Sequence, residues 1–190
     1  MTDIRFDFSG RTAIVTGAAS GLGREIALEL GASGAFVIVS DLKDEACRAV
    51  VDEIAAAGGK AKAFAADVTD EDTMHAMASF AEKDCGGLHM AVNNAGIGGP
   101  SMSTGDYPSQ DWRRVIDINL NGVFYGMRWQ IPAMLRAGGG SIVNMSSILG
   151  SVGFANSAPY VAAKHGILGL TKTAAMEYAQ QGIRVNAVGP

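Results

Sequence analysis

The residues best suited to chemistry are a tyrosine and a lysine near the carboxyl end of the chain. Tyr160 and Lys164 are four residues apart, so on a helix their side chains share one face, one turn apart. An ammonium beside a phenol stabilises the phenolate, and so lowers the tyrosine pKa from its usual value of about 10. Such a tyrosine can exchange a proton near neutral pH as a general acid or base. Because surface helices often carry this spacing, two solvated side chains are the alternative.

Two further polar residues could act on the same reacting group. Ser147 lies 13 residues before Tyr160, just after an expected strand, and its hydroxyl could donate a hydrogen bond to an oxygen that gains negative charge. Ser146 is the competing candidate. Asn119 falls inside a long expected helix, where asparagine is a poor helix former. A local kink or a bound water would explain it, and a solvated helix face is the alternative.

A glycine-rich turn could hold a diphosphate group. Residues 16–23 read TGAASGLG and lie between an expected strand and an expected helix. Gly17 permits a tight turn, Gly21 lets the backbone approach a ligand, and Gly23 lets the helix pack against the strand. Ser20 could donate a hydroxyl hydrogen bond or cap the helix, whose N-terminus attracts anions. An ordinary turn is the alternative, which the flanking strand and helix make less favoured.

An acidic residue at the end of the second expected strand bears on the choice of cofactor. Asp41 lies 18 residues after Gly23, where a dinucleotide site places a carboxylate on the adenosine ribose. The carboxylate would repel a 2′-phosphate, and Ser20 offers no positive charge, so both favour NAD over NADP. Lys43 is a nearby cation that could tolerate the phosphate. A helix cap is the alternative role for Asp41.

Polar residues also follow the next two expected strands. Asp67 and Val68 come after the third strand, where the carboxylate could accept a hydrogen bond from an adenine amino group. The alternative is a cap for the helix that begins near residue 70. The segment Asn93 to Gly96, NNAG, follows the fourth strand, and its small residues and amides suit a crevice for a flat ligand. A plain turn is again the alternative.

Short apolar runs alternate with longer helical patterns along the whole chain. This alternation predicts βαβ units, a parallel sheet, and right-handed crossovers that place helices on both faces. The predicted fold is a single α/β domain over residues 1–190, a doubly wound, three-layer Rossmann sheet in strand order 3-2-1-4-5-6. The expected strands cover residues 11–16, 35–40, 62–66, 88–92, 140–145 and 183–188, and the expected helices cover residues 22–30, 44–57, 70–83, 109–136 and 158–181.

Two places depart from this regular pattern. Pro132 is expected to kink or end the helix over residues 109–136, because proline has no N–H to donate within a helix. The sixth strand is followed only by Gly189 and Pro190, so we expect the chain to be truncated within a domain.

The composition favours a globular protein in the cytoplasm. The 190 residues are 48% hydrophobic and 18% charged, with a net charge of −4 and no basic stripe, which counts against a nucleic-acid partner. No apolar stretch is long enough to span a membrane, and the charged start MTDIRFDFSG is unlike a signal peptide. The two cysteines, Cys47 and Cys85, lack zinc or disulfide spacing, and His75, His89 and His165 are too scattered to predict a metal site.

Two smaller groups of residues carry weaker signals. Arg113 and Arg114 are expected to form a solvated helix face. Met102, Leu149 and Phe154 lie in expected loops that could wall a substrate pocket, which would favour a non-ionic substrate. Core or interface packing explains these three residues equally well.

Taken in order along the chain, these motifs resemble those of the short-chain dehydrogenase/reductase family. The matching residues run from the TGxxxGxG turn to Asp67, the NNAG segment, Asn119, Ser147, the YxxxK pair and the segment 186–190, NAVGP. They cover essentially the whole chain in the family's order, so together they are far more specific than any one of them. The resemblance implies that family members continue beyond this length, with a seventh strand and a mobile substrate lid.

The resemblance also implies roles for individual residues. Tyr160 would be the acid/base, Ser147 would position the substrate carbonyl, Lys164 would bind the nicotinamide ribose and lower the tyrosine pKa, and Asn119 would hold a water in a proton relay. The cofactor-binding residues implied are Gly17, Ser20, Gly21, Leu22, Gly23, Asp41, Leu42, Asp67, Val68, Asn94, Ala95, Gly96, Tyr160, Lys164 and Pro190.

The expected activity is reversible hydride transfer between NAD(H) and a small secondary alcohol or ketone, with NADP less favoured as the cofactor. The alternatives are an NADP-dependent 3-oxoacyl carrier-protein reductase and, in another class, a non-catalytic nucleotide-binding or regulatory protein. The family resemblance implies that the two long helices pair across a two-fold axis in a homodimer or homotetramer. The apolar residues of these two helices exceed what one sheet face is expected to cover: Trp112, Val115, Val123, Phe124, Leu168 and Met176.

Overall fold

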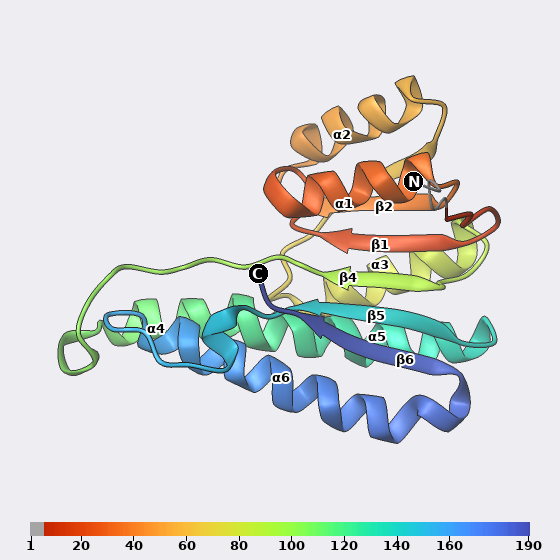
Figure 1. Cartoon of the computed structure of the whole chain (residues 1–190). Helices are drawn as coiled ribbons and strands as arrows, with labels where there is room; N and C mark the ends of the chain where they lie inside the picture. Colours follow the sequence, from red (N-terminus) through yellow and green to blue (C-terminus); the bar gives the residue numbers. More distant parts are fainter. Residues whose placement is uncertain (1–5) are drawn as a thin grey trace, which may run out of the picture.

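Six parallel strands form one sheet in the order β3-β2-β1-β4-β5-β6 in the computed structural model, which describes residues 6–190 (Figure 1). The order reverses between β1 and β4, which leaves a crevice at the carboxyl ends of these two strands. The predicted fold class and strand order are therefore confirmed. Part of the charged N-terminal segment, residues 1–5, lies outside the described residues. The strands are β1 (Thr12–Thr16), β2 (Phe36–Asp41), β3 (Lys60–Ala65), β4 (Met90–Asn93), β5 (Gly140–Met145) and β6 (Ile183–Val188).

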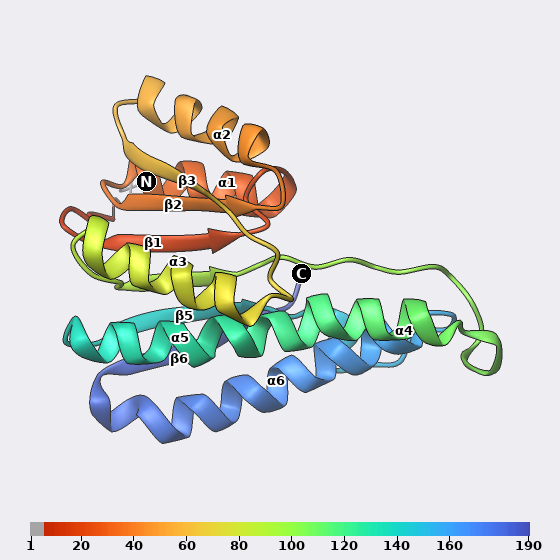
Figure 2. The same ribbon diagram turned by 180° about the vertical axis from the view of Figure 1, so that it is seen from behind.

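Helices cover both faces of the sheet, because each βα unit crosses over in the same right-handed sense (Figures 1 and 2). The first two, α1 (Gly21–Ala32) and α2 (Asp44–Ala56), pack on one face around Val15, Val37 and Val39. Three others pack on the opposite face around Ile14, Ile38 and Ile142: α3 (Glu71–Asp84), α5 (Gly122–Arg136) and α6 (Ala158–Tyr178). The remaining helix, α4 (Ser109–Ile116), leads toward α5 and packs against α6 beyond the ends of the strands (Figures 1 and 2).

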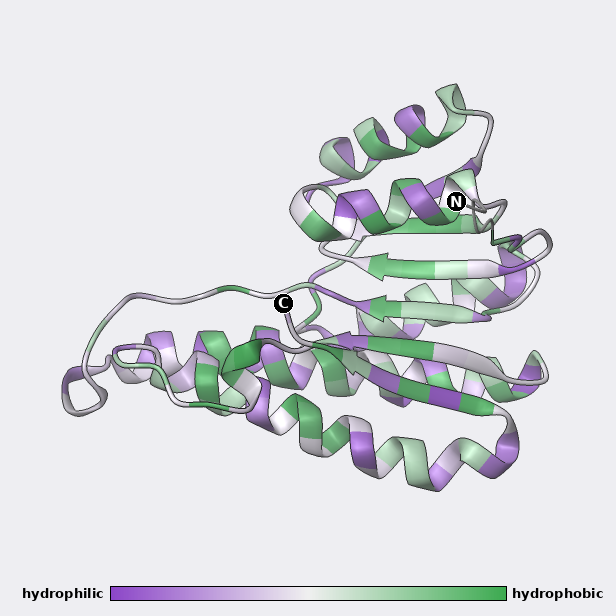
Figure 3. Cartoon of the chain, in the orientation of Figure 1, coloured by the Kyte–Doolittle hydropathy of each residue, from purple (hydrophilic) through white to green (hydrophobic). Residues whose placement is uncertain are grey.

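The central strands are apolar on both faces, whereas the edge strand β6 is not. All five residues of β1 are buried, as expected for a strand with helices on each side. In β6, buried Ile183 and Val185 alternate with exposed Arg184 and Asn186, and the hydropathy colouring shows the same alternation (Figure 3). One face of β6 is therefore open among the described residues. No helix in the described part of the chain is long and apolar enough to cross a membrane.

The long helix over residues 109–136 forms as predicted, with one irregular turn in its middle. The segment Asp117–Asn121 between α4 and α5 is a π-helical turn, so Asn119 does lie at a local irregularity. Pro132, however, does not end the helix, because α5 continues to Arg136. The neighbouring residues Ala133 and Met134 are fully buried against the core, and this packing compensates for the hydrogen bond that the proline cannot make.

Candidate active site

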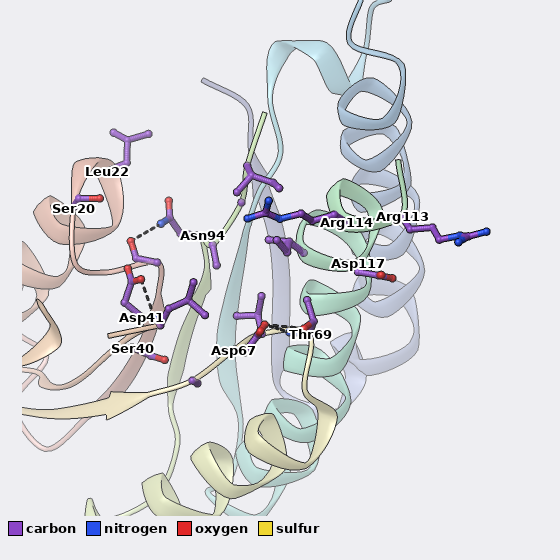
Figure 4. A pocket seen from close by; sticks show the side chains of 18 of the residues that line it. Ser20, Leu22, Ser40, Asp41, Asp67, Thr69, Asn94, Arg113, Arg114 and Asp117 are labelled. Carbon is purple, nitrogen blue, oxygen red and sulfur yellow. Dashed lines mark hydrogen bonds between the residues drawn. The ribbon is translucent and has the colours of Figure 1, made fainter. Parts of the chain in front are cut away.

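A cleft of about 880 Å³ lies at the carboxyl ends of the strands, where the strand order reverses (Figure 4). One wall consists of the glycine-rich turn and the end of β2, and the other consists of the segments after β3 and β4 together with α4. Among the residues predicted to bind a cofactor, those that line this cleft are Gly17, Ser20, Leu22, Asp41, Leu42, Asp67, Val68, Asn94, Ala95 and Gly96.

The glycine-rich turn is held tightly against the end of β4. Gly17 has φ of +63°, which only glycine adopts readily, and a Cβ on it would lie 2.9 Å from Ala95 Cα. A Cβ on Gly23 would collide with the Gly17 carbonyl oxygen and lie 2.5 Å from Asn94 Nδ2. That amide nitrogen donates to the Thr16 and Gly17 carbonyl oxygens at 3.0 and 3.1 Å. The Asn94 side chain therefore holds the glycine-rich turn in place, a role that its sequence position alone did not reveal.

Open space remains where a ligand needs it. A Cβ on Gly21, at φ of +55°, would meet nothing within 4 Å, so the backbone at the start of α1 is bare. Ser20 is the N-cap residue of α1, but its side chain makes no capping hydrogen bond there, so the predicted capping role is not seen. Its hydroxyl and the unpaired N–H groups at the start of α1 face a site suited to an anion.

The two acidic residues lie at the cleft and are held by main-chain donors. Asp41 Oδ2 accepts from Ala19 N at 3.0 Å, and its Oδ1 accepts from Leu42 N at 2.8 Å, so this carboxylate also ties β2 to the glycine-rich turn. Asp67 Oδ1 accepts from Thr69 N at 2.9 Å and from Thr69 Oγ1 at 2.8 Å. The alternative role for Asp67 as a helix cap is not seen, because Asp70 caps α3.

Ser40, which was not among the predicted residues, also lines the cleft. Its side chain is 1% exposed, and its hydroxyl oxygen has no hydrogen-bond partner among the described residues. A buried hydroxyl without a partner is costly and points to a polar ligand or a water in the cleft. The Ser40 hydroxyl, the glycine cradle and the bare start of α1 together make a lining that fits a dinucleotide.

A second cavity of about 370 Å³ adjoins the first, because Leu22, Asn94, Gly96 and Ile97 line both. It contains Ser147, Tyr160, Lys164 and Pro190 as well. The structure therefore brings three of the four predicted catalytic side chains to the end of the cofactor cleft.

Lys164 is almost fully buried beside Tyr160. Its Nζ lies 5.4 Å from the centroid of the Tyr160 ring and donates to the Met145 carbonyl oxygen at 2.6 Å. Burial lowers the pKa of Lys164 to about 8, because a charged amine loses hydration there. The position of a cation against the phenol ring is the arrangement that the four-residue spacing predicted.

The two adjacent serines differ in how free their hydroxyls are. Ser146 is buried, and its Oγ donates to the Lys164 carbonyl oxygen at 3.1 Å, so it fastens α6 to the end of β5. Ser147 is half-buried; its Oγ accepts from Leu149 N at 3.2 Å and donates to the Pro190 carbonyl oxygen at 3.4 Å. Both serines line the cavity, but the Ser147 hydroxyl makes only this long bond to a carbonyl at the cavity itself, so its hydrogen is the more easily turned toward a substrate oxygen.

Asn119 is fully buried outside the catalytic cavity, behind one of its walls. Its Oδ1 accepts from Ile97 N at 2.7 Å, and its Nδ2 donates to the Ile97 carbonyl oxygen at 2.8 Å. Ile97 lines both cavities, so the side chain of Asn119 fixes the wall between them. Its part in a proton relay stays a prediction.

A buried network of polar side chains supports the same strand ends, and the sequence analysis missed it. Asn93 Nδ2 donates to Gln130 Oε1 at 3.1 Å and to Asn144 Oδ1 at 2.9 Å, and Asn144 Nδ2 donates to Thr171 Oγ1 at 3.0 Å. Asn93 and Asn144 are register partners in β4 and β5. The residue that follows each of them in the chain lines the catalytic cavity. Buried amides in facing strands were the only signal in the sequence.

The described residues contain no cluster of three or more potential metal ligands. A glycine-rich cradle at the carboxyl ends of parallel strands, with a tyrosine and a buried lysine on α6 beside it, is typical of a dinucleotide-dependent oxidoreductase. Residues 11–190 match the family model for short chain dehydrogenases. The chain belongs to this family of NAD(P)-dependent enzymes and is an oxidoreductase of secondary alcohols.

Two curated relatives act on six-membered carbon rings. A cyclohexanol dehydrogenase of Acinetobacter sp. (strain SE19) is 52% identical over 183 residues, which is 96% of this chain and 73% of the relative. A 2,5-dichloro-2,5-cyclohexadiene-1,4-diol dehydrogenase of Sphingobium indicum is 45% identical over 185 residues, which is 97% of this chain and 73% of the relative.

Two similar solved structures contain different cofactors. A carveol dehydrogenase from Mycobacterium avium in complex with NAD has a TM-score of 0.94 at 32% identity, with 97% of this chain and 72% of that chain covered. A metagenomic short-chain oxidoreductase in complex with NADP has a TM-score of 0.92 at 38% identity, with 96% and 82% covered. Both cofactors therefore occur on this fold.

Proposed function

We propose that this protein is an NAD-dependent dehydrogenase that interconverts an uncharged alicyclic secondary alcohol and its ketone. The observation that carries the proposal is the single cavity in which Tyr160, Lys164 and Ser147 meet the end of a dinucleotide cleft. A binding or regulatory protein would have no need for a lysine buried against a tyrosine at this position.

The proposed mechanism assigns one task to each side chain. In oxidation, Tyr160 takes the hydroxyl proton of the alcohol as a phenolate, and Ser147 donates a hydrogen bond to the same oxygen. Lys164 would hold the nicotinamide ribose, and its positive charge stabilises the phenolate. NAD, when bound, would supply the acceptor for the hydride of the carbinol carbon. Tyr160 returns the proton to the oxygen when the ketone is reduced.

The choice of NAD rests on charge at the adenosine end of the cleft. Asp41 lies there as a carboxylate with two main-chain donors, and the neighbouring Ser20 is not basic. A 2′-phosphate would meet a negative charge with no cation from the glycine-rich turn. This argument also counts against the alternative of an NADP-dependent 3-oxoacyl carrier-protein reductase.

The substrate class rests on the residues around Ser147 and on the named relatives. Ile148 and Phe154, on the segment between β5 and α6, are both 64% exposed, and Met102 is bonded through its N–H to the Asn156 carbonyl oxygen of that segment. These exposed apolar side chains on the segments around Ser147 support a substrate without charge. Dehydrogenases of cyclohexanol and of a chlorinated cyclohexadienediol are among the similar proteins, which supports a ring alcohol.

Titration and turnover together test this proposal. NADH and NADPH are titrated by fluorescence, and cyclohexanol, a linear secondary alcohol and a 3-oxoacyl thioester are then tried with each cofactor. We expect tighter NADH binding and NAD-dependent oxidation of cyclohexanol, and Asp41→Asn should narrow the difference between the cofactors because repulsion falls. Tighter NADPH binding with reduction of the thioester would favour the reductase instead.

We also propose a cytoplasmic homodimer or homotetramer. Trp112, Phe124 and Met176 are exposed on α4, α5 and α6, which supports self-association through these helices. Val115 and Val123, by contrast, are buried within the protomer, so the expectation that they add to an apolar surface is wrong. Both cysteines are unpaired, as is usual in a reducing compartment. Sedimentation equilibrium at micromolar concentration tests the assembly, and a monomer would contradict it.

A further inference from the structure

Arg114 occupies a position in the cofactor cleft that the sequence did not predict. Gln110, Arg114 and Ile118 follow one another at four-residue intervals along α4 and the π-helical turn, and all three line the cleft. The guanidinium of Arg114 points from α4 into the cleft, toward the wall that holds Asn94 (Figure 4). The adjacent Arg113 also contributes to the lining, but its guanidinium points away from the cleft and fits the solvated face that was expected for both arginines (Figure 4).

The charges around the cleft leave Arg114 without a partner. Asp41, Asp67 and Asp117 line it, and the only cationic side chains in its lining are Arg113 and Arg114. Neither arginine forms an ion pair with any described residue, whereas four other arginines do: Arg24, Arg48, Arg128 and Arg136. An arginine aimed into a cleft, but not paired there, is available to an anionic ligand.

The dinucleotide that this family binds brings such an anion. Its diphosphate carries two negative charges, and the glycine-rich turn supplies N–H groups, the Ser20 hydroxyl and the start of α1, but no cationic side chain. The position that could have carried a cation in this turn is Ser20. We propose that Arg114 binds the diphosphate of the cofactor from the α4 side of the cleft and supplies the positive charge that the glycine-rich turn lacks. The inference rests on dinucleotide binding in this cleft, and it holds for NAD and NADP alike.

A pair of neighbouring variants tests this assignment by binding alone. Arg114→Gln and Arg113→Gln each remove one positive charge from α4, but only the first removes a charge that points into the cleft. NADH is titrated by its fluorescence, and ADP and adenosine are measured by displacement of NADH. Because the arginine is exposed and its charge is screened, we expect Arg114→Gln to weaken NADH and ADP by about fivefold, and Arg113→Gln by less than about twofold.

The ligand series separates a phosphate contact from stacking on adenine. Adenosine has no phosphate, so its affinity should be the same in Arg114→Gln and in the unaltered protein. The dependence of ADP affinity on salt concentration should also become shallower in Arg114→Gln. Melting temperatures should match in both variants, because each arginine is exposed and unpaired.

Two results would overturn the assignment. Equal affinities of the Arg114→Gln and Arg113→Gln variants for ADP would show that Arg114 does not touch the diphosphate. An equal loss for adenosine and ADP would place the guanidinium on the adenine ring instead. If the unaltered protein bound neither NADH nor NADPH, the dinucleotide cleft itself would be wrong, which is a different failure from that of Arg114.

Discussion

The ammonium nitrogen of Lys164 lies 2.6 Å from the main-chain carbonyl oxygen of Met145, the last residue of β5. This contact fixes the amine at the edge of the sheet, next to the Tyr160 ring, at the cost of burying a charge. The carbonyl is one partner, and the remaining N–H groups are free for a ligand in the cavity. One lysine therefore joins the strand end, the phenol and the proposed ribose site.

Burial of Lys164 predicts a pH dependence of cofactor binding. Its pKa is lowered to about 8, so the amine is charged at pH 7 and loses its proton as the pH rises through 8. Because a charged donor binds a ribose hydroxyl more strongly than a neutral one, the dissociation constant of NADH should rise by roughly 3- to 10-fold between pH 7 and 9.5. Fluorescence titration at constant ionic strength measures this dissociation constant at each pH.

Two variants on α6 make that test specific. Lys164→Met should bind NADH weakly at every pH, with a flat profile. Lys172→Met, at an exposed position of the same helix, should keep the profile of the unaltered protein. A dissociation constant that stayed constant in the unaltered protein up to pH 9.5 would show that the charge of Lys164 does not act on the cofactor.

The glycine-rich turn should not tolerate a methyl group at Gly23. In Gly23→Ala, the Cβ would collide with the Gly17 carbonyl oxygen, so the turn must move, at a cost of about 1–3 kcal/mol in the free energy of unfolding. NADH affinity should fall with it. The control is Gly169→Ala in α6, where a Cβ would meet nothing within 4 Å and helix propensity would add about 1 kcal/mol of stability. Urea unfolding measures the free energy of unfolding of both variants. A Gly23→Ala protein as stable as Gly169→Ala would refute the cradle geometry.

The sequence predicted those features that depend on local pattern. Apolar runs of β-branched residues identified the strands, and alternation with helices predicted their order, because parallel strands need crossovers. The same rule brought Gly17, Asp41 and Asp67 to one edge of the sheet, since each lies at or just after the carboxyl end of a strand. The Tyr160 and Lys164 pair was predictable because helical spacing places both side chains on one face.

Contacts between distant segments could not be predicted in this way. Asn119 bonds to Ile97, which is 22 residues earlier in the chain, and Asn93 bonds to Gln130 and Asn144 across two elements. Such partners depend on how helices pack, which periodicity does not specify. The position of α4 beside the cleft likewise decides which of Arg113 and Arg114 directs its guanidinium into the cleft (Figure 4).

Asn119 should matter for stability as well as for turnover. Asn119→Ala removes both hydrogen bonds to Ile97 and leaves the N–H and carbonyl groups of Ile97 without these partners at a partly buried position, which should cost about 1–3 kcal/mol in the free energy of unfolding. Turnover should also fall, since Ile97 lines both cavities. Asn121→Ala, in the same π-helical turn, removes only an exposed bond to Asp117 and is the matched control. Equal stability of the two variants in urea would contradict the role given to Asn119.

The proton-transfer role of Tyr160 is the central claim, and replacement of its hydroxyl tests it most directly. Tyr160→Phe keeps the ring beside Lys164 and removes only the proton carrier, whereas Tyr178→Phe removes a hydroxyl at the far end of the same helix. The measurement is the turnover number for NAD-dependent oxidation of cyclohexanol, with NADH affinity measured alongside. Tyr160→Phe should lower turnover by roughly 10²-fold or more, the usual weight of general acid/base catalysis, with NADH affinity nearly unchanged. Near-normal turnover in Tyr160→Phe, equal to that of Tyr178→Phe, would contradict the claim and leave Ser147 or a bound water to carry the proton.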